Sequence, residues 1–517
     1  MTLEVAPLQN GGFEMSTTAP RRIAGTILMS GLLCGVSAPA LAQAVATAPT
    51  SASSGVSQEQ ALALAARLDA LEQQNRDLEA QVYDLKAQVA GGEQAIRQDI
   101  AAQPKITLSN ARPQITTPDG NFSFALRSVV QFDAASYNVS PLRTDNDLGS
   151  GTNFRRARLG FDGTAFKDWN YSLWGEFGGS GGESPALNQA YIEYTGLKPF
   201  GPDVQLRIRG GAWATPTGLE DATSNTESLF LERAASAELV RNFAGGDGRT
   251  GVGVFANGQR WYASAVWTGK TVGVPATAEF DQQSGFLLRG AFNPLKGQDY
   301  DVHIGASYQG ILEAADTAAG PVRTQALRLR ERPEIRVDGN RLVDTGNINA
   351  GGLRALGLEG GASFRQFYAA GEWFKVKVQR SAPSRFDPEF SGWYLQGAWT
   401  LTGERHVWSS QNGGFRGIKP DKPFDRSKGT WGAFEVAGRY SVLNLNDHEG
   451  VGGAATPAGG MRGGEQKITT LGLNWYPNSV VRFLLDYQWI KVNRLSAAGG
   501  NLDTDANVIS LRSQVAF

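Results

Sequence analysis

The feature that most constrains this chain is an alternation of apolar and polar residues that recurs along most of its length. In the last eleven residues, apolar side chains share one face (Ile509, Leu511, Val515 and Phe517) and polar ones share the other (Ser510, Arg512 and Gln514). A strand of about ten residues with two such faces fits a membrane-spanning β-barrel, whose outside meets lipid and whose inside meets water. A soluble antiparallel sheet with one solvated face shows the same alternation, so a single strand of this kind is weak evidence.

Repetition favours the barrel. About sixteen alternating segments follow one another between residues 121 and 517, within the even-numbered range of bacterial barrels. The connections are tight at 257–259 and 477–479, and long in three spans: 213–248, 310–352 and 444–465. The connection 403–430 is an exception, because counting strands places it on the side of the tight turns although it is long. The predicted fold is all-β: a transmembrane antiparallel β-barrel of about 16 strands over 121–517, preceded by an N-terminal α-helical coiled coil.

The N-terminal region predicts export. Arg21 and Arg22 precede an apolar stretch at 23–36, and Ala40-Leu-Ala42 then forms a small-x-small cleavage site, so residues 1–42 are predicted to be a signal peptide. Met15 is a more natural start than Met1 because it brings the basic pair closer to the N-terminus. The one cysteine, Cys34, lies in this peptide, so the mature chain would have no disulfide. An exported, cysteine-free β protein with 64 glycines suggests a Gram-negative outer membrane.

A linker at 43–56 leads to a predicted periplasmic coiled coil at 57–90. The apolar seam recurs with alternating spacings of four and three, interrupted by one polar residue: Leu64, Leu68, Leu71, Asn75, Leu78, Val82, Leu85 and Val89. Gly91 and Gly92 are expected to end the helix, and a second linker is expected at 91–120. A coiled coil pairs with copies of itself, which predicts an oligomer; the alternative is a lone amphipathic helix packed on a domain.

The positions of the arginines are the feature of the sequence that most indicates a function. The net charge is −1, which makes no case for binding nucleic acid, but arginines are predicted on the inward faces of many strands: Arg127, Arg156, Arg158, Arg207, Arg209, Arg289, Arg439, Arg482 and Arg512. Six more crowd the span 310–352: Arg323, Arg328, Arg330, Arg332, Arg336 and Arg341. A guanidinium is always charged and offers a planar fork of donors that suits phosphate and carboxylate. Such a row can pass an anion from site to site. Alternatively, these arginines merely pair with inward acids: Asp133, Asp162, Glu176, Glu193, Glu372, Glu435 and Asp486.

Catalysis is not indicated. The three histidines, His303, His406 and His448, form no recognisable pattern with serine or carboxylate, and the segment 444–447 is too short for a calcium loop. No catalytic residue, metal or cofactor is predicted.

Several blocks resemble the phosphate-selective porin O and P family over about residues 120–517. They are Phe154-Arg-Arg-Ala-Arg158, Arg332-Pro-Glu334, Arg341-Leu-Val-Asp-Thr-Gly346, Trp393-Tyr-Leu-Gln396, Thr400-Leu-Thr-Gly-Glu-Arg405, Ile418-Lys-Pro420, Gly432-Ala-Phe-Glu-Val-Ala-Gly-Arg-Tyr-Ser441 and Gly472-Leu-Asn-Trp-Tyr-Pro-Asn478. The resemblance implies a trimeric, sixteen-stranded porin that moves phosphate or polyphosphate. It also implies that 213–248, 310–352 and 403–430 fold into the lumen. One departure is Ala214-Thr-Pro-Thr217, where the family commonly has a lysine and, after x-Pro, a phenylalanine.

We therefore expect a homotrimeric porin in outer-membrane lipid that passes inorganic phosphate or other anions. The alternatives are a general or organic-solute porin without phosphate preference, and a structural tether of the outer membrane with little conductance. The candidate anion-binding, pore-lining residues are Arg156, Arg158, Arg207, Arg209, Arg328, Arg330, Arg332, Arg439 and Arg482. A basic periplasmic vestibule is expected from Lys419, Lys422, Arg426 and Lys428. Arg207 and Arg209, which lead into 213–248, are expected at the constriction, and Arg512 away from any long loop.

Overall fold

The computed structural model describes residues 57–517 except 110, 144–145, 180–185, 274–280, 320–321 and 382–385. The predicted signal peptide (1–42) and the linker 43–56 lie outside the described residues.

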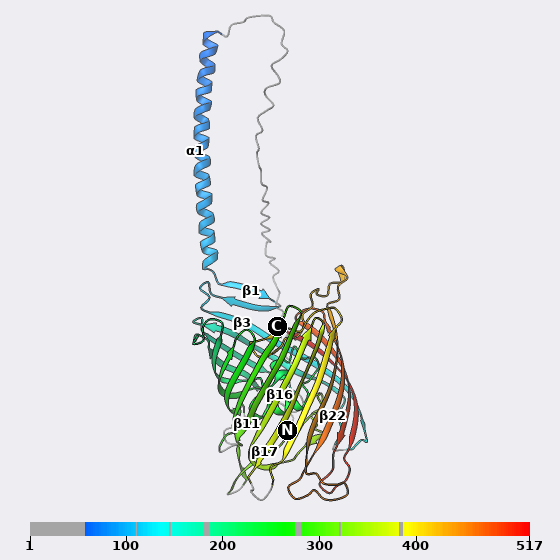
Figure 1. Cartoon of the computed structure of the whole chain (residues 1–517). Helices are drawn as coiled ribbons and strands as arrows, with labels where there is room; N and C mark the ends of the chain where they lie inside the picture. The colour runs from blue at the N-terminus through cyan, green and yellow to red at the C-terminus, as the bar shows by residue number, and fades with distance from the viewer. Residues whose placement is uncertain are drawn as a thin grey trace, which may run out of the picture. The chain divides into compact units, whose positions relative to one another are not determined.

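Sixteen strands form the wall of a closed antiparallel barrel (Figure 1). They are β3 (Ser123–Ser140), β4 (Gly151–Ala165), β5 (Trp169–Glu176), β6 (Ala186–Tyr194), β7 (Gln205–Trp213), β8 (Arg249–Asn257), β9 (Trp261–Thr271), β10 (Ser284–Lys296), β11 (Tyr300–Glu313), β16 (Ile348–Phe364), β17 (Phe367–Arg380), β18 (Glu389–Thr400), β21 (Ala433–Asp447), β22 (Met461–Tyr476), β23 (Val481–Asn493) and β24 (Thr504–Ala516). The last strand, β24, pairs with β3 from Asp505↔Ser140 to Ala516↔Val129 and closes the ring. The predicted barrel is confirmed.

The wall has an apolar outside and a polar inside. On β24, Ile509 and Leu511 are 49% and 46% exposed, whereas Ser510 and Arg512 are 2% and 1% exposed. This order is the reverse of a soluble sheet, in which the apolar face is buried. It is the order that a barrel in lipid requires. Among the described residues, no helix is long and apolar enough to cross a membrane.

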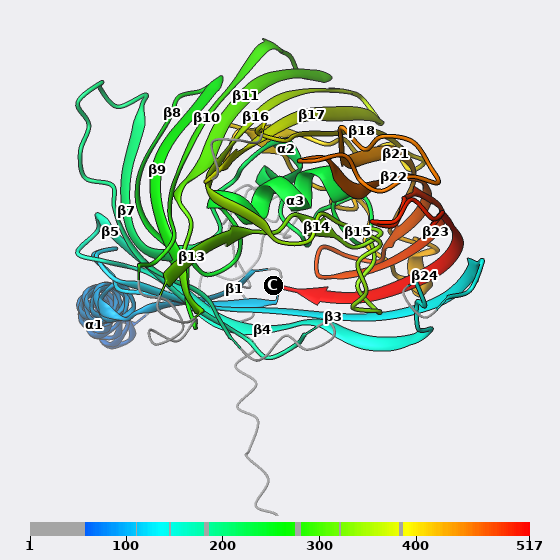
Figure 2. The same cartoon turned by 90° about the horizontal axis from the view of Figure 1, so that it is seen from below.

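Two long loops enter the lumen from one end, which we call the loop side. The first joins β7 to β8 and contains α2 (Leu219–Ala222) and α3 (Ala235–Ala244). The second joins β11 to β16 and contains β12 (Asp316–Ala319), β13 (Val322–Leu327), β14 (Arg330–Glu331) and β15 (Val343–Asp344). Figure 2 shows α3 inside the ring of strands. The folding of 213–248 and 310–352 into the lumen is thus as expected.

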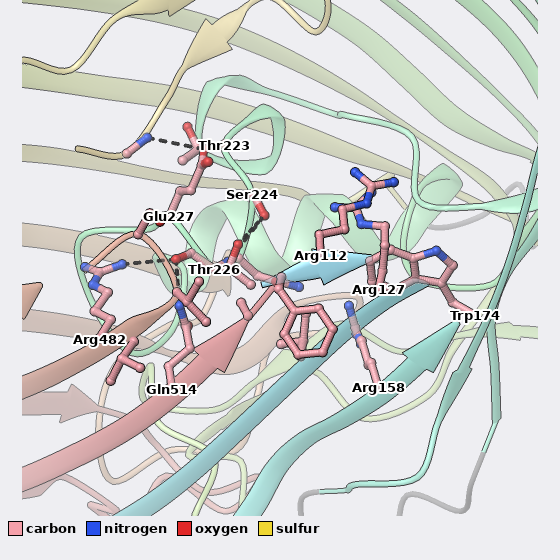
Figure 3. Close-up of a pocket in the computed structure, with 18 of the residues that line it drawn as sticks. Arg112, Arg127, Arg158, Trp174, Thr223, Ser224, Thr226, Glu227, Arg482 and Gln514 are labelled. Carbon is pink, nitrogen blue, oxygen red and sulfur yellow. Dashed lines mark hydrogen bonds between the residues drawn. The ribbon is translucent and has the colours of Figure 1, made fainter. Parts of the chain in front are cut away.

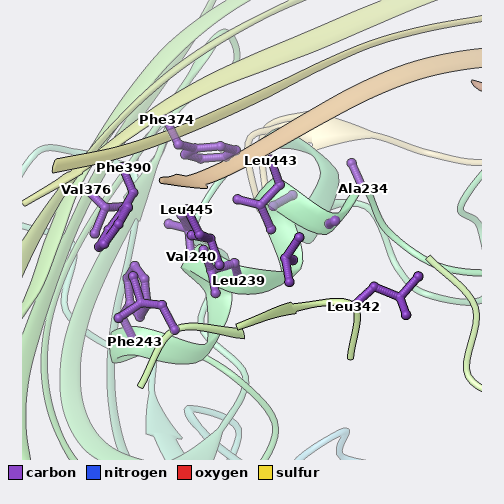
Figure 4. Packing of buried hydrophobic residues seen from close by; sticks show 14 of the residues in the cluster. Ala234, Leu239, Val240, Phe243, Leu342, Phe374, Val376, Phe390, Leu443 and Leu445 are labelled. Atoms are coloured by element: carbon purple, nitrogen blue, oxygen red, sulfur yellow. The ribbon is translucent and has the colours of Figure 1, made fainter. Parts of the chain in front are cut away.

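An apolar cluster anchors these loops to the wall. The α3 side chains of Leu239, Val240 and Phe243 pack against inward apolar residues of β17, β18 and β21 (Phe374, Val376, Phe390, Leu443 and Leu445; Figure 4). Each fully buried side chain of this size contributes about 1.5–3 kcal/mol. The cluster occupies the lumen beside these strands.

The long connection between β18 and β21 enters the lumen from the opposite end, the turn side. It contains β19 (Trp408–Ser409), β20 (Gly414–Phe415) and a 3₁₀ turn, η2 (Arg426–Lys428). Arg207 donates to the carbonyl of Gln411 at 2.7 Å, and Arg289 to that of Asn412 at 2.7 Å. A Cβ on Gly414 would lie 2.8 Å from the Cβ of Ala222, so only glycine permits this approach to α2. The exception in the loop pattern is therefore a connection that folds inward.

The region before the barrel differs from the prediction. Helix α1 runs from Gln58 to Ala102, so Gly91 and Gly92 do not end it. Each glycine lowers the stability of the helix by about 1 kcal/mol relative to alanine, and the surrounding residues with high helix propensity offset this cost. The Ser57 and Gln60 side chains cap its start reciprocally, at 3.2 and 3.3 Å. The expected linker 91–120 therefore holds the end of α1 and a hairpin of β1 (Lys105–Ser109) and β2 (Arg112–Thr116).

Candidate anion pathway

Two cavities lie in the open part of the lumen. The loop-side cavity, of about 550 Å³, is bounded by the inward loops and by β4, β5 and β6. The turn-side cavity, of about 510 Å³, is bounded by the turn 478–481, the chain end Phe517 and the hairpin β1–β2 (Figure 3). Five residues line both cavities: Arg158, Asn188, Arg233, Arg241 and Asp247. The two cavities therefore meet at these five side chains, which we call the junction.

Arginine dominates the loop-side cavity. Among the described residues, eleven arginines line it: Arg155, Arg156, Arg158, Arg233, Arg241, Arg249, Arg328, Arg330, Arg332, Arg336 and Arg341. The acidic residues in the same lining are four: Glu176, Glu238, Asp247 and Glu331. The excess of fixed positive charge gives this space a positive potential, because arginine stays ionised at any physiological pH.

The turn-side cavity has a smaller excess. Its described lining contains seven basic side chains: Arg112, Arg127, Arg158, Arg233, Arg241, Lys419 and Arg482. Its acidic ones are Asp221, Glu227 and Asp247. A positively charged lining therefore continues from one cavity through the junction into the other.

Asp247 is the carboxylate of the junction. It accepts a hydrogen bond from Arg158 at 2.7 Å and from Arg241 at 2.5 Å. Burial acts to raise the pKa of Asp247, but the guanidiniums of Arg241 and Arg158 outweigh it and hold that pKa well below its usual range. Its side chain remains 36% exposed. An ionised carboxylate thus pairs with two arginines at the junction and faces the open space.

A β-bulge supplies one more arginine than alternation predicts. Between β3 and β4 the register passes from Gln131↔Arg156 to Phe132↔Phe154, so Arg155 is the extra residue. Arg155 and Arg156 are consequently both turned inward, at 7% and 3% exposure. The bulge explains why alternation alone misses Arg155.

Arg155 helps to hold the first long loop through Glu232. It binds this carboxylate at 2.7 and 3.2 Å, and Arg512 binds it at 2.9 Å. Burial acts to raise the pKa of Glu232, yet Arg155, Arg512 and Arg156 together hold that pKa well below normal. Arg512 also forms two 2.7 Å bonds with Asp133. The expectation that Arg512 lies away from any long loop is wrong, because a strand far along the chain closes the barrel beside that loop.

Two of the candidate pore-lining arginines, Arg156 and Arg482, form no ion pair with the described residues. Among the described residues, Arg156 has no carboxylate within ion-pair distance and binds Gln131 Oε1 at 2.6 Å. Arg482 likewise has none; it lies 4.6 Å above the Tyr476 ring, and its Nε and Nη2 atoms make no hydrogen bond to the described residues. The charges of Arg156 and Arg482 are therefore not neutralised by a direct ion pair to a described carboxylate.

Three of the nine candidate pore-lining arginines line neither cavity. Arg207 is covered by the inward connection at Gln411. Arg209 makes two bonds to Glu193, at 2.9 and 2.7 Å, and its guanidinium lies 4.0 Å above Tyr191. Neither therefore belongs to the junction.

Arg439 is the third. Its side chain is fully buried and joins Glu220 of the first loop, at 3.1 Å, to Glu334 of the second, at 2.5 Å. It clamps both loops to β21 and has no face toward either cavity.

Of the four predicted vestibule residues, one lines a cavity. Lys419 lines the turn-side cavity, whereas Lys422, Arg426 and Lys428 are exposed and line neither cavity. Lys428 pairs with Asp425 at 3.0 Å. By contrast, the predicted loop arginines Arg328, Arg330 and Arg332 do line the loop-side cavity. The residues that the sequence did not reveal are Arg112, Arg155, Arg233, Arg241, Arg249 and Asp247; three of them, Arg233, Arg241 and Asp247, lie on the loop between β7 and β8 and not on a strand.

A closed barrel of sixteen strands with an apolar outer wall, a polar lumen and inward loops is the architecture of an outer-membrane porin. The sequence profile of the family phosphate-selective porin O and P matches residues 124–517. The chain belongs to this family, and its place is the outer membrane of a Gram-negative bacterium.

Two relatives illustrate the match. Porin O of Pseudomonas aeruginosa is 27% identical over 417 residues, which are 77% of this chain and 90% of that protein. An uncharacterized protein of Caulobacter vibrioides is 26% identical over 436 residues, or 81% of this chain and 78% of that one. Among solved structures, OmpT of Vibrio cholerae gives a TM-score of 0.44 at 10% identity over 77% of this chain and 98% of that one. An anion-selective porin from Comamonas acidovorans gives 0.42 at 13% over 77% and 100%.

Proposed function

We propose that this porin gives passive, anion-selective diffusion along the two joined cavities. The observation that carries the proposal is the lining of the loop-side cavity, in which eleven arginines face four acidic side chains among the described residues. Cations and anions would both enter an uncharged pore of this size, whereas a positively charged lumen concentrates anions and repels cations. Transport of this kind needs no catalytic group, and the family and Porin O are porins, which are channels rather than enzymes.

Partial neutralisation suits passage better than tight binding. Conduction requires sites that attract the ion but release it to the next one. Arg158 forms ion pairs with Asp247 and Glu176, and Arg328 forms one with Asp344. Such pairs leave an incoming anion to compete with a resident carboxylate. In this proposal the stronger attraction comes from the arginines without an ion pair, Arg156, Arg330 and Arg482. Lys419 extends the positive lining toward the periplasm.

The arginine lining suits oxyanions with several acceptor atoms, because a planar guanidinium group can bind such an anion through two parallel hydrogen bonds. Inorganic phosphate is the natural test ion. Ala214 lines the turn-side cavity where the family commonly has a lysine. The absence of this positive side chain favours a broader range of permeating anions, including larger or organic ones.

We also propose that three copies assemble. Strand β5 has 8 residues, and β6, β7 and β8 have 9 each. At about 3.3 Å per residue and a tilt near 45°, nine residues rise about 21 Å, less than the roughly 25 Å apolar band of such barrels. Apolar residues on this low wall, such as Ile192 and Val252, are 59% and 57% exposed. Copies of the same barrel would shield it from lipid and water.

Helix α1 supports self-association independently. Seven apolar seam residues between Leu64 and Val89 are 48–63% exposed in the single chain. A parallel coiled coil of three copies in the periplasm would bury this seam.

The test is the ion selectivity of purified full-length protein in planar bilayers. We expect a zero-current potential of anion sign in a KCl gradient, and a chloride current that falls as phosphate is added. Weak selectivity without phosphate block would instead support a general porin, and absence of conductance would support a structural tether. Either result would overturn the proposal.

A further inference from the structure

The hairpin β1–β2 precedes the region that the family profile matches, which starts at residue 124, yet it forms part of the turn-side cavity. Ser109, Arg112 and Gln114 belong to the lining. The sequence predicted only a linker here. A segment that precedes the barrel therefore faces the route that ions would take.

The barrel seam explains why the hairpin sits there. Strand β24 ends at Ala516, and Phe517 exchanges two 3.0 Å backbone hydrogen bonds with Ser128. The first residues of β3, which precede Ser128, are left without β24 as a neighbour. Strand β2 takes this place, with Gln114↔Ala125 and Thr116↔Ser123 as partners. Pairing removes an open strand edge, and it fixes the hairpin beside the mouth of the barrel.

This position brings Arg112 next to Arg127 (Figure 3). Both guanidiniums approach the same carboxylate oxygen, Oδ2 of Asp162, at 3.4 and 2.7 Å. The other oxygen of Asp162 accepts from Ser172 at 2.6 Å and from the Trp174 indole at 2.9 Å. Two positive charges therefore share one negative charge whose acceptor sites are already in use.

The cluster is accessible from the cavity. The side chains of Arg112 and Arg127 are 33% and 39% exposed, and Arg127 is 4.5 Å above the Trp174 ring. The Nε atoms of both arginines are buried and make no hydrogen bond to the described residues, so the exposed parts of the two side chains face the cavity. An oxyanion entering at the periplasmic mouth would meet two positive charges that are compensated by one carboxylate.

We propose that the hairpin β1–β2 is a cap on the periplasmic mouth, and that Arg112 and Arg127 form an additional oxyanion site there. The inference rests on the proposed anion conduction and adds a mouth-specific site to it. The site takes phosphate or a similar oxyanion, and it depends on a residue outside the barrel strands.

One-sided phosphate block tests the site. Phosphate is added to either face of single channels that carry wild-type, Arg112→Gln or Arg112→Lys protein in KCl. Orientation is assigned with Ala498→Cys in the loop 494–503 of every variant, blocked from one side by a membrane-impermeant thiol reagent. The matched control is Lys105→Gln, which removes one charge from the same hairpin at an exposed position that lines neither cavity.

For Arg112→Gln we expect the half-blocking phosphate concentration to rise about five-fold from the periplasmic side, the scale of a partly exposed ionic contact. From the other side it should change less than about two-fold, and Arg112→Lys should retain part of the block. A periplasmic half-block equal to wild type, or an equal shift in Lys105→Gln, would overturn the inference. Wild-type channels without anion preference would instead refute the proposed function itself.

Discussion

Removing the junction carboxylate should tighten anion binding and slow passage. Asp247→Asn keeps the shape of the side chain but removes one of the carboxylates that neutralise Arg158 and Arg241, which Asp247 contacts at 2.7 and 2.5 Å. Arg158 keeps Glu176 and Arg241 keeps Asp221 as partners. Two charges about 4 Å apart interact by about 4 kcal/mol at an effective dielectric of 20. The side chain is 36% exposed, so solvent screening reduces this to about 1–2 kcal/mol. Since 1.4 kcal/mol is a factor of ten, a permeating anion should bind about ten-fold more tightly.

The assay is phosphate block of single-channel chloride current. We expect the half-blocking concentration of Asp247→Asn to fall about ten-fold and the saturating phosphate conductance to fall as well, because release becomes slow. Glu389→Gln is the matched control: it also removes one carboxylate, paired with Lys375 at 2.8 Å, but at an exposed position that lines neither cavity. A half-block in Asp247→Asn that is unchanged or higher than wild type would refute the reasoning.

Three further outcomes follow from the same geometry. Burial raises the pKa of Glu331 to about 7, so this lining residue is neutral below that pH and negative above it; anion selectivity measured in KCl should fall from pH 6 to pH 8, and Glu331→Gln should remove the change. Lys419→Gln should reduce anion selectivity whereas Lys428→Gln should not, and equal effects in reversal potentials would contradict the assigned positions. Deleting 57–90 should lower the temperature at which oligomers dissociate in detergent gels, and an unchanged temperature would argue against a stabilising coiled coil.

The barrel could be predicted because lipid and water impose a two-residue period on every strand. The period assigns β24 correctly, with Leu511 outside and Ser510 inside. It fails at Arg155, where one bulged residue shifts the register and a side chain expected outside turns inward. A bulge of this kind leaves no mark in the alternation of a single strand, because it is defined by the partner strand.

The site was harder to predict, because inward direction does not establish contact with the open lumen. Arg207 and Arg439 point inward as predicted, but one is covered by the connection at Gln411 and the other is buried between Glu220 and Glu334. Which part of the wall the loops cover depends on contacts between segments more than a hundred residues apart. Arg241 and Asp247 lie on one of those loops, where no periodic pattern marks them.

We expect the two cavities, and not the part of the wall that carries Arg207 and Arg209, to determine ion selectivity. The most direct measurement is the zero-current potential in a KCl gradient for two double variants, Arg156→Gln/Arg482→Gln and Arg207→Gln/Arg209→Gln. Each removes two inward arginines, but only the first pair lines the cavities. We expect the first variant to lose much of its anion selectivity and the second to stay close to wild type. Loss of selectivity in the second variant together with wild-type selectivity in the first would contradict the account.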